Sequence, residues 1–176
     1  MKIELQTMLD TCSEELDDID RIIEQLNAFD KSRSYLTNYA LIRAAGTAES
    51  VYRSIVADYF SRYGDARIDR FLDSAIRRGA SSVTYNNMKS LLKKFDKQWS
   101  QDFEDHVKSR SDHEQLVGSS NSLVSNRHAF AHGQSLSTSF SDVKKYYLDV
   151  VKLIKILDKV VCCDIINNAS LQNSQE

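Results

Sequence analysis

The sequence predicts an all-α protein, a single bundle of four to six helices, and three observations support this fold class. The 176 residues include no proline and only five glycines, where average usage supplies about nine prolines. Tight hairpins depend on these two residue types, so the sequence argues against multi-stranded sandwiches and barrels. The glycine-rich and Cys-x-x-Cys motifs of dinucleotide folds, P-loop enzymes and zinc ribbons are missing. Apolar residues instead recur at helical spacing.

The first predicted helix spans residues 5–26 and has the clearest pattern. Residues 1–30 carry a net charge of −7, and the rest of the chain therefore carries +5. We interpret the acidic face of this helix as solvated; the alternative is a docking surface for a basic partner. The apolar residues alternate at spacings of four and three, which places them on one face: Leu5, Leu9, Cys12, Leu16, Ile19, Ile23 and Leu26.

The second predicted helix runs from residue 34 to 63 and the third from residue 65 to 78. Gly64 and Gly79 follow them directly, and glycine is the usual residue after a helix because it accepts a left-handed backbone. The second helix is expected to face the core with Tyr35, Tyr39, Ile42, Ala45, Ala48, Tyr52, Ile55 and Tyr59.

A more polar segment, residues 84–110, is predicted to form two short helices that divide near Asp96. Residues 77–97 carry a net charge of +5, and aromatic residues are interleaved with the cations. Such a segment can track RNA phosphates while its rings stack on bases. The alternative is a solvated basic face whose aromatic residues belong to the core. The aromatic residues are Tyr85, Phe95 and Trp99, and the candidate RNA-binding cations are Arg77, Arg78, Lys89, Lys93, Lys94 and Lys97.

The last two predicted helices span residues 112–131 and 141–167, on either side of a serine-rich loop. Residues 168–176 are polar and are predicted to form a flexible tail. No internal repeat or linker divides the chain. Residues 1–167 are therefore interpreted as one helical domain, as expected for a chain of 176 residues that is 41% hydrophobic and 27% charged.

The cysteines and the N-terminal sequence predict a cytoplasmic protein. Cys12, Cys162 and Cys163 are odd in number and lie among apolar residues, so they are expected to be thiols in a reducing compartment. The N-terminal residues lack the apolar stretch of a secretion signal, and no apolar run approaches membrane-spanning length. We therefore expect no membrane contact.

The segment from Leu123 to Gly133 departs from the expected pattern. At 100° per residue, Arg127 falls in the middle of the apolar face of its helix. A guanidinium there is costly unless it is paired, faces a cavity or meets another subunit. His128 and His132 lie along the edge of that face, one turn apart, where Gly133 is expected to end the helix.

Three interpretations of this cluster are open. Two histidines at i and i+4 can bind zinc, but the other histidines, His106 and His113, have no matching spacing. In a structural interpretation, Arg127 pairs with an acid of the first helix and both histidines are surface residues. In the third, the cluster is a metal-free phosphodiesterase site, because imidazole transfers protons near neutral pH and a guanidinium holds a phosphate and its transition state.

Arg127, four intervening residues and His132, closed by an Ala-His-Gly sequence, resemble the R-x-x-x-x-H motif of the HEPN superfamily of small helical ribonucleases. The layout is most similar to the RiboL-PSP type. The resemblance implies a homodimer whose motif helices meet across a twofold axis, forming a composite cleft that cuts RNA without metal or another cofactor. It assigns Arg127 to the scissile phosphate and His132 to proton transfer, with His128 and Asn126 as auxiliary or RNA-orienting residues. The products would be a cyclic phosphate and a 5′-hydroxyl.

This resemblance implies a toxin or phage-defence effector, with an antitoxin or a defence-system protein as a further partner besides RNA. The alternative is a non-catalytic HEPN-like module that binds RNA, a nucleotide or a partner protein. On an ideal helix Arg127 and His132 point about 140° apart. Either the helix is distorted, therefore, or the two residues act from different subunits.

Overall fold

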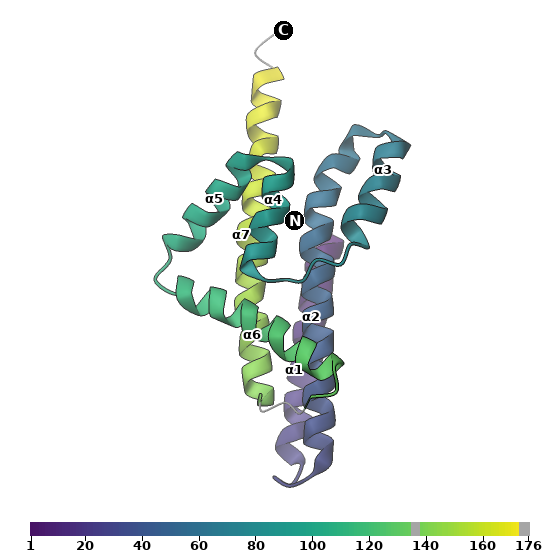
Figure 1. The fold of residues 1–176 in the computed structure, drawn as a ribbon, viewed down its shortest axis with the longest axis vertical. Coiled ribbons are helices and arrows are strands. Elements are labelled where there is room, and N and C mark those ends of the chain that lie inside the picture. The colour runs from purple at the N-terminus through teal and green to yellow at the C-terminus, as the bar shows by residue number, and fades with distance from the viewer. Residues whose placement is uncertain (135–137, 173–176) are drawn as a thin grey trace.

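A computed structural model describes the backbone of residues 1–134 and 138–172, and the side chains of these residues except Tyr63 and residues 163–172. These residues form seven α-helices and no β-strand (Figure 1). The prediction of an all-helical bundle is confirmed. The seven helices correspond to the seven segments predicted individually, including the third helix and the two within residues 84–110; the bundle size of four to six helices was too small by one.

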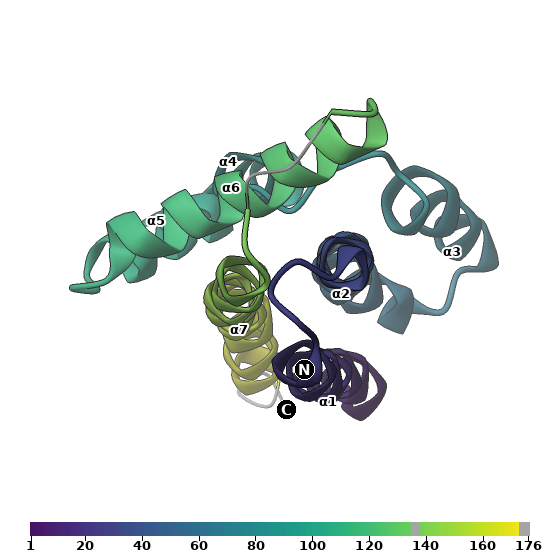
Figure 2. The same ribbon diagram turned by 90° about the horizontal axis from the view of Figure 1, so that it is seen from below.

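The helices form two layers (Figures 1 and 2). The long helices α1, α2 and α7 make one layer, and the short helices α3, α4, α5 and α6 cover α2 and α7. The long helices are α1 (Ile3–Gln25), α2 (Lys31–Phe60) and α7 (Phe140–Gln172). The short ones are α3 (Ala66–Leu72), α4 (Tyr85–Phe95), α5 (Lys97–Lys108) and α6 (His113–Ala131), with a 3₁₀ turn at Ser61–Tyr63 and a π-helical turn at Asp73–Arg77.

The apolar face of α1 packs as its spacing predicts. All its expected core residues from Leu5 to Ile23 are buried, and Leu26 lies at the C-cap, just after the helix. The Tyr147 hydroxyl of α7 donates to the Leu9 carbonyl at 2.8 Å, so this otherwise apolar contact also satisfies a buried phenol. Helix α1 therefore closes the core on the side of α2 and α7 that lies away from the short helices (Figure 2).

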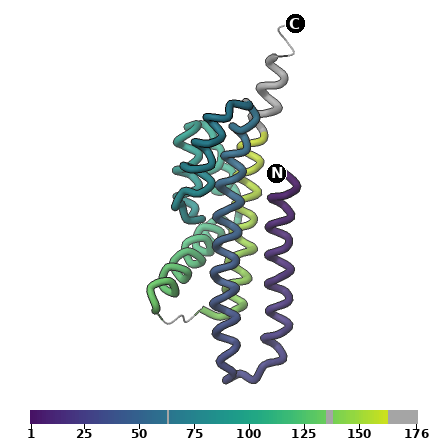
Figure 3. Tube along the Cα trace, turned by 90° about the vertical axis from the view of Figure 1, so that its right-hand side faces the viewer, coloured from purple at the N-terminus to yellow at the C-terminus, as the bar shows by residue number. Residues whose placement is uncertain are grey.

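The N-terminal half of α2 corrects the sequence prediction. Tyr35, Tyr39 and Ile42 were expected in the core, but they are 68%, 53% and 42% exposed. This half of α2 buries its alanine-rich face, including Ala40 and Ala44, and the α1–α2 hairpin extends past the end of α6 (Figure 3). The second layer does not reach these side chains. Apolar periodicity predicts a face, but not whether another helix covers it.

Several helix ends follow their local residues. Gly64 adopts a φ of 70° directly after the 3₁₀ turn that prolongs α2, as its sequence position predicts. The break at Asp96 is confirmed, because its carboxylate accepts from the Gln98 backbone N–H at 2.6 Å and caps α5. Helix α7 continues to Gln172, beyond the end predicted near residue 167, and residues 173–176 lie outside the described residues.

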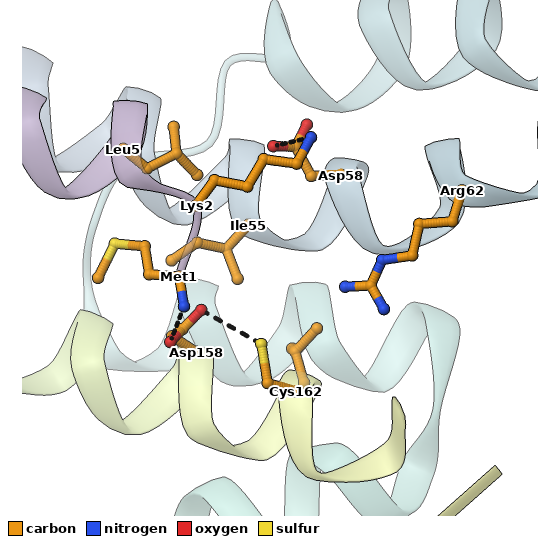
Figure 4. A pocket seen from close by; sticks show the side chains of 9 residues that line it. Met1, Lys2, Leu5, Ile55, Asp58, Arg62, Asp158 and Cys162 are labelled. Carbon is orange, nitrogen blue, oxygen red and sulfur yellow. Dashed lines mark hydrogen bonds and ion pairs between the residues drawn. The ribbon is translucent and has the colours of Figure 1, made fainter. Parts of the chain in front are cut away.

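The start of α1 is tied to α7 through one carboxylate (Figure 4). The Met1 amine donates to Asp158 at 2.8 Å, and the Cys162 thiol donates to the other oxygen of that carboxylate at 3.5 Å. Lys2 pairs with Asp58 of α2 at 3.0 Å. These contacts surround a cavity of about 250 Å³ where α1, α2 and α7 meet. No residue of α6 lines it.

The cysteines lie on the long helices. Cys12 is buried and Cys162 is half-buried, and both are free thiols. Burial raises the pKa of the Cys12 thiol. The Cys163 side chain lies outside the described residues. Within the described part of the chain, no helix combines the length and apolar character needed to cross a membrane.

Candidate active site

The helix that carries the Arg-x-x-x-x-His motif is anchored through Asp149 of α7. This carboxylate is 2% exposed and accepts from Gln115 and Ser119 of α6, each at 2.8 Å. Leu116 and Leu123 of α6 are fully buried in the core beside it. Apolar packing and a satisfied buried acid thus hold α6 against α7, and its C-terminal end lies over α2 (Figure 1).

Gly133 ends α6 in the way its sequence position predicts. Its φ is 73°, its N–H donates to the Phe130 carbonyl at 2.9 Å, and the Gln134 N–H donates to Ala129 at 3.0 Å. This is the Schellman arrangement, which satisfies the last carbonyls of a helix through a left-handed glycine. His132 is therefore the C-cap, where the helix meets solvent.

Arg127 contacts a buried acid of α2. Its Nη2 lies 3.3 Å from Oε2 of Glu49. The Glu49 side chain is 8% exposed, whereas 34% of the Arg127 side chain remains exposed. The structural interpretation expected an ion pair with the first helix; the pair exists, but the acid comes from the second helix. Arg127 is consequently held in place and still accessible to a ligand.

Glu49 is incompletely satisfied in this pair. Its Oε1 is buried and has no hydrogen-bond partner among the described residues. Burial raises the pKa of the Glu49 carboxyl, and the charges of Arg127, Arg53 and His128 together with the Val83 backbone N–H oppose that rise. Burial prevails, so the carboxylate is costly to keep charged. One oxygen of Glu49 is therefore buried without a partner among the described residues, and the contact of Arg127 with the other is long, at 3.3 Å.

Glu49 was not among the site residues predicted from the sequence. The sequence does contain a signal for Glu49, because this acid directly follows a run of small residues, residues 44–48. Most residues of that run are buried in the structure. A charged residue in such a run needs a partner. Which of the 23 cations supplies it is not visible in the sequence, because Arg127 lies 78 positions away.

The two histidines of the motif are exposed. Neither the His128 nor the His132 imidazole has a hydrogen-bond partner among the described residues. Helix α6 is regular as far as Ala131, so Arg127 and His132 leave it in different directions. The distorted helix considered above is not observed. Within one chain the structure provides a held guanidinium and a free imidazole on different faces of one helix end.

Asn126 has a local structural contact. Its Oδ1 accepts from the Thr138 hydroxyl at 2.5 Å, and its Nδ2 donates to the Ser122 carbonyl at 2.8 Å. Both polar atoms of the amide are thus engaged, which ties the end of α6 to the residues that lead into α7. An auxiliary or RNA-orienting role for Asn126 remains a prediction.

The exposed apolar residues of α2 lead to this site. At 100° per residue, Tyr35, Tyr39, Ile42 and Gly46 lie on one face of α2, and Glu49 continues the same face by one turn. The four residues of this face that precede Glu49, from Tyr35 to Gly46, are all exposed. Nothing lies within 4 Å of a Cβ built on Gly46. An uncovered apolar face therefore adjoins the place where Arg127 meets Glu49.

Half of the cations of the basic segment at residues 77–97 are paired. Arg77 pairs with Asp58 at 2.5 Å, Arg78 pairs with Asp73 at 2.8 Å, and Lys89 pairs with Glu104. Paired cations attract phosphate weakly. The remaining three, Lys93, Lys94 and Lys97, are exposed.

The aromatic residues of the basic segment pack inward. Trp99 is 3% exposed, Phe95 stacks on Phe60, and Tyr85 stacks on Phe103. These rings belong to the core or its edge and do not form a surface platform for bases. The arrangement agrees with the alternative of a solvated basic face whose aromatic residues are structural.

Possible metal ligands do not gather in the described part of the chain. No group of three or more His, Cys, Asp and Glu side chains there is arranged to hold a metal ion. His128 and His132 are exposed at the end of α6, without a third ligand among the described side chains. The site offers a guanidinium, two imidazoles and one buried carboxylate.

Comparison with known proteins gives one match. The family model described as RiboL-PSP-HEPN matches residues 9–162. This range contains α2 to α6 completely, and with them Glu49, Arg127 and His132. No curated protein and no solved structure matches the chain.

Proposed function

The chain belongs to the RiboL-PSP-HEPN family, and from that premise we propose that it is a metal-independent endoribonuclease. The observation that carries the proposal is the pairing of Arg127 with Glu49: an accessible guanidinium is held by a buried carboxylate, one oxygen of which has no hydrogen-bond partner among the described residues. A phosphodiester can bind this guanidinium and supply the stronger charge-assisted hydrogen bonds that Glu49 does not.

The proposed reaction uses the ribose 2′-hydroxyl as nucleophile. Its oxygen attacks the scissile phosphorus while the bond from phosphorus to the 5′-oxygen breaks. Arg127 binds the phosphate and stabilises the charge that develops on it, and His132 removes the 2′ proton or protonates the leaving 5′-oxygen. The products are a 2′,3′-cyclic phosphate and a 5′-hydroxyl. DNA is not cut in this mechanism, because it lacks the 2′-hydroxyl.

The proposed active unit is a homodimer. The exposed face formed by Tyr35, Tyr39 and Ile42 adjoins the Arg127–Glu49 pair, and exposed apolar patches on soluble proteins mark interaction sites. A twofold contact there brings two copies of the α6 end together. Arg127 of one copy can then act with His132 of the partner copy, which is compatible with the different directions in which the two residues leave α6.

A cleavage assay tests the nuclease proposal. The full chain is incubated with labelled single-stranded and structured RNAs in EDTA, beside Arg127→Ala and His132→Ala. We expect cleavage by the wild type and a loss of at least about 100-fold in each variant. Arg110→Ala and His113→Ala are matched controls at the other end of α6, where Arg110 pairs with Asp112 on the surface. These controls should cleave normally.

Three outcomes contradict the proposal. Absence of cleavage by the wild type across several RNA classes supports the alternative, a HEPN-like module that binds RNA, a nucleotide or a partner protein. Cleavage that EDTA abolishes supports a metal-dependent site. An unfolded Arg127→Ala variant, detected by circular dichroism, shows that the guanidinium serves the fold.

Mixing the two inactive variants tests the composite cleft. A heterodimer of Arg127→Ala and His132→Ala contains one site with both functional residues if they act across the interface. We expect mixing to restore part of the cleavage, and Tyr39→Glu to prevent both the dimer, measured by analytical ultracentrifugation, and the activity. A monomeric, active wild type contradicts this arrangement. A nuclease of this kind suits a toxin or phage-defence effector that an antitoxin or another defence protein restrains.

A further inference from the structure

A second cavity, which is polar, is lined by Arg53, one turn of α2 after Glu49 of the candidate active site. It has a volume of about 310 Å³ and is bounded by α2, α4 and the segment that follows α3. Two cations, Arg53 and Lys94, line it together with the polar side chains of Ser81, Asn87 and Ser90, and no acidic residue does. Cations, hydroxyls and an amide without carboxylates make a lining suited to an anion.

Arg53 contributes a guanidinium that is only partly used. Its Nη1 donates to the carbonyl oxygens of Gly79 and Ser81, the latter at 3.4 Å, which fixes the side chain against the segment after α3. Its Nε is buried and has no partner among the described residues. A buried, unpaired N–H of a charged group is costly. The guanidinium lines the cavity, where an anionic oxygen can pair with its positive charge.

The other polar side chains of the cavity differ in whether they already have hydrogen-bond partners. The Ser81 hydroxyl already accepts from Tyr52 at 2.5 Å, and the Asn87 amide already donates to Ser82 at 2.8 Å. Ser90 and Lys94 are one turn apart on α4 and are exposed. The inner wall is thus preformed, while the outer wall carries a hydroxyl and an ammonium that are open to an incoming ligand.

The cavity is connected to Arg127 through α2. Arg53 follows Glu49 by one turn, about 6 Å along the helix axis, and the positive charges of Arg127 and Arg53 both act on the Glu49 carboxyl. The guanidinium groups of Arg127 and Arg53 therefore both interact electrostatically with one buried acid. A single strand of RNA that places one phosphate on Arg127 can extend along this face to the cavity.

We infer that this cavity is a phosphate-binding subsite, which holds a backbone phosphate of the RNA substrate other than the scissile one. The inference rests on the proposed function and adds a specific binding position to it. It also separates two lysines that the sequence analysis treated alike. Lys94 lines the cavity, whereas Lys93 is equally exposed on the same helix but does not.

The matched pair Lys94→Glu and Lys93→Glu tests the subsite. The probe is a fluorescein-labelled, single-stranded 2′-O-methyl oligoribonucleotide, which lacks the attacking hydroxyl, and its binding to the full chain is followed by anisotropy at several salt concentrations. We expect Lys94→Glu to weaken binding about tenfold and to reduce the salt dependence by about one phosphate contact. Ser90→Glu should act in the same direction, and Lys93→Glu should change the Kd less than about twofold.

Failure of the subsite is distinguishable from failure of the nuclease. Equal effects of Lys93→Glu and Lys94→Glu, or no binding by the wild type, overturn the subsite. If the wild type cleaves RNA while Lys94→Glu leaves KM and Kd unchanged, the nuclease stands and the subsite falls. If Lys94→Glu selectively weakens binding but the wild type never cleaves, the cavity binds RNA phosphate and the nuclease proposal is wrong.

Discussion

Two buried acids contact α6, one at each half of the helix, and their surroundings are opposite. Asp149 of α7 accepts from Gln115, Ser119 and Lys152, each at 2.8 Å. Burial raises its pKa, but these three donors outweigh burial and hold the pKa of Asp149 below its ordinary value. Glu49 of α2 has a 3.3 Å contact to Arg127 and one unpartnered oxygen, and its pKa is raised.

The difference separates a structural acid from a functional one. A buried carboxylate with all its partners fixes the position of the helix, and α6 is anchored at Asp149 for that reason. A buried carboxylate with a weak partner has an oxygen without a hydrogen bond and a shifted pKa, and groups with shifted pKa values cluster at functional sites. The Asp149 end of α6 therefore serves the fold, and the Glu49 end is the place to look for chemistry.

The largest expected effect is on stability at the structural acid. Asp149→Ala leaves the buried Ser119 hydroxyl and the Gln115 amide of α6 without their acceptor, so we expect the free energy of unfolding to fall by about 3 kcal/mol. Chemical denaturation followed by circular dichroism measures it. Asp105→Ala, which removes an exposed acid, is the control and should cost less than about 0.5 kcal/mol. A loss at Asp149 as small as that of the control would remove the distinction between the two acids.

The second prediction concerns the functional acid at neutral pH. Glu49→Gln removes a buried charge that is costly to keep, so the thermal midpoint at pH 7 should rise by about a few degrees. Asp149→Asn should lower it, because there the charge is well paired. Melting curves of both variants under identical conditions check the signs. A decrease for Glu49→Gln would show that the ion pair with Arg127 stabilises the fold.

The third prediction is a difference in pH dependence. The pKa of Glu49 is raised above the ordinary 4.5, so the folded protein holds this proton more tightly and stability falls as pH rises through the raised pKa. The pKa of Asp149 is lowered below the ordinary 3.8, so its contribution is present above that value and is lost on acidification.

Thermal melts between pH 3 and 8 separate these two contributions. In the wild type, stability should fall as pH rises above 4.5, and in Glu49→Gln this fall should be absent. Asp149→Asn should instead lose part of the decline in acid. Identical pH profiles for the two variants would contradict the opposite shifts.

The smallest effect is expected at Glu104 of α5, a partly exposed acid whose side chain is 17% exposed. Lys108 and Lys89 both pair with Glu104 and lower its pKa to about 2. Solvent screens such pairs, so Lys89→Ala should lower the thermal midpoint at pH 7 by at most about one or two degrees. That small difference should disappear as pH falls toward 2, where Glu104 becomes protonated. An effect comparable to Asp149→Ala would mean that exposure is a poor guide to the importance of an acid in this fold.

Much of the architecture could be predicted from local pattern. The seam of α1, the break at Asp96 and the end of α6 at Gly133 each depend on residues within a few positions of one another. The unusual position of Arg127 was visible for the same reason, because a helical face is defined by neighbours along the chain. Local preferences therefore identified the helices and the guanidinium that needed a partner.

The tertiary structure alone decided which partner that is and which apolar faces are covered. Glu49 meets Arg127 across 78 positions of sequence, and Tyr35, Tyr39 and Ile42 stay exposed because the second layer ends before them. Which side chains pair between helices and which apolar faces are covered depend on how whole helices cross. The spacing of residues along one helix does not determine that crossing. The sequence by itself determined the helices and their chemistry; the packing of two layers determined the site they make.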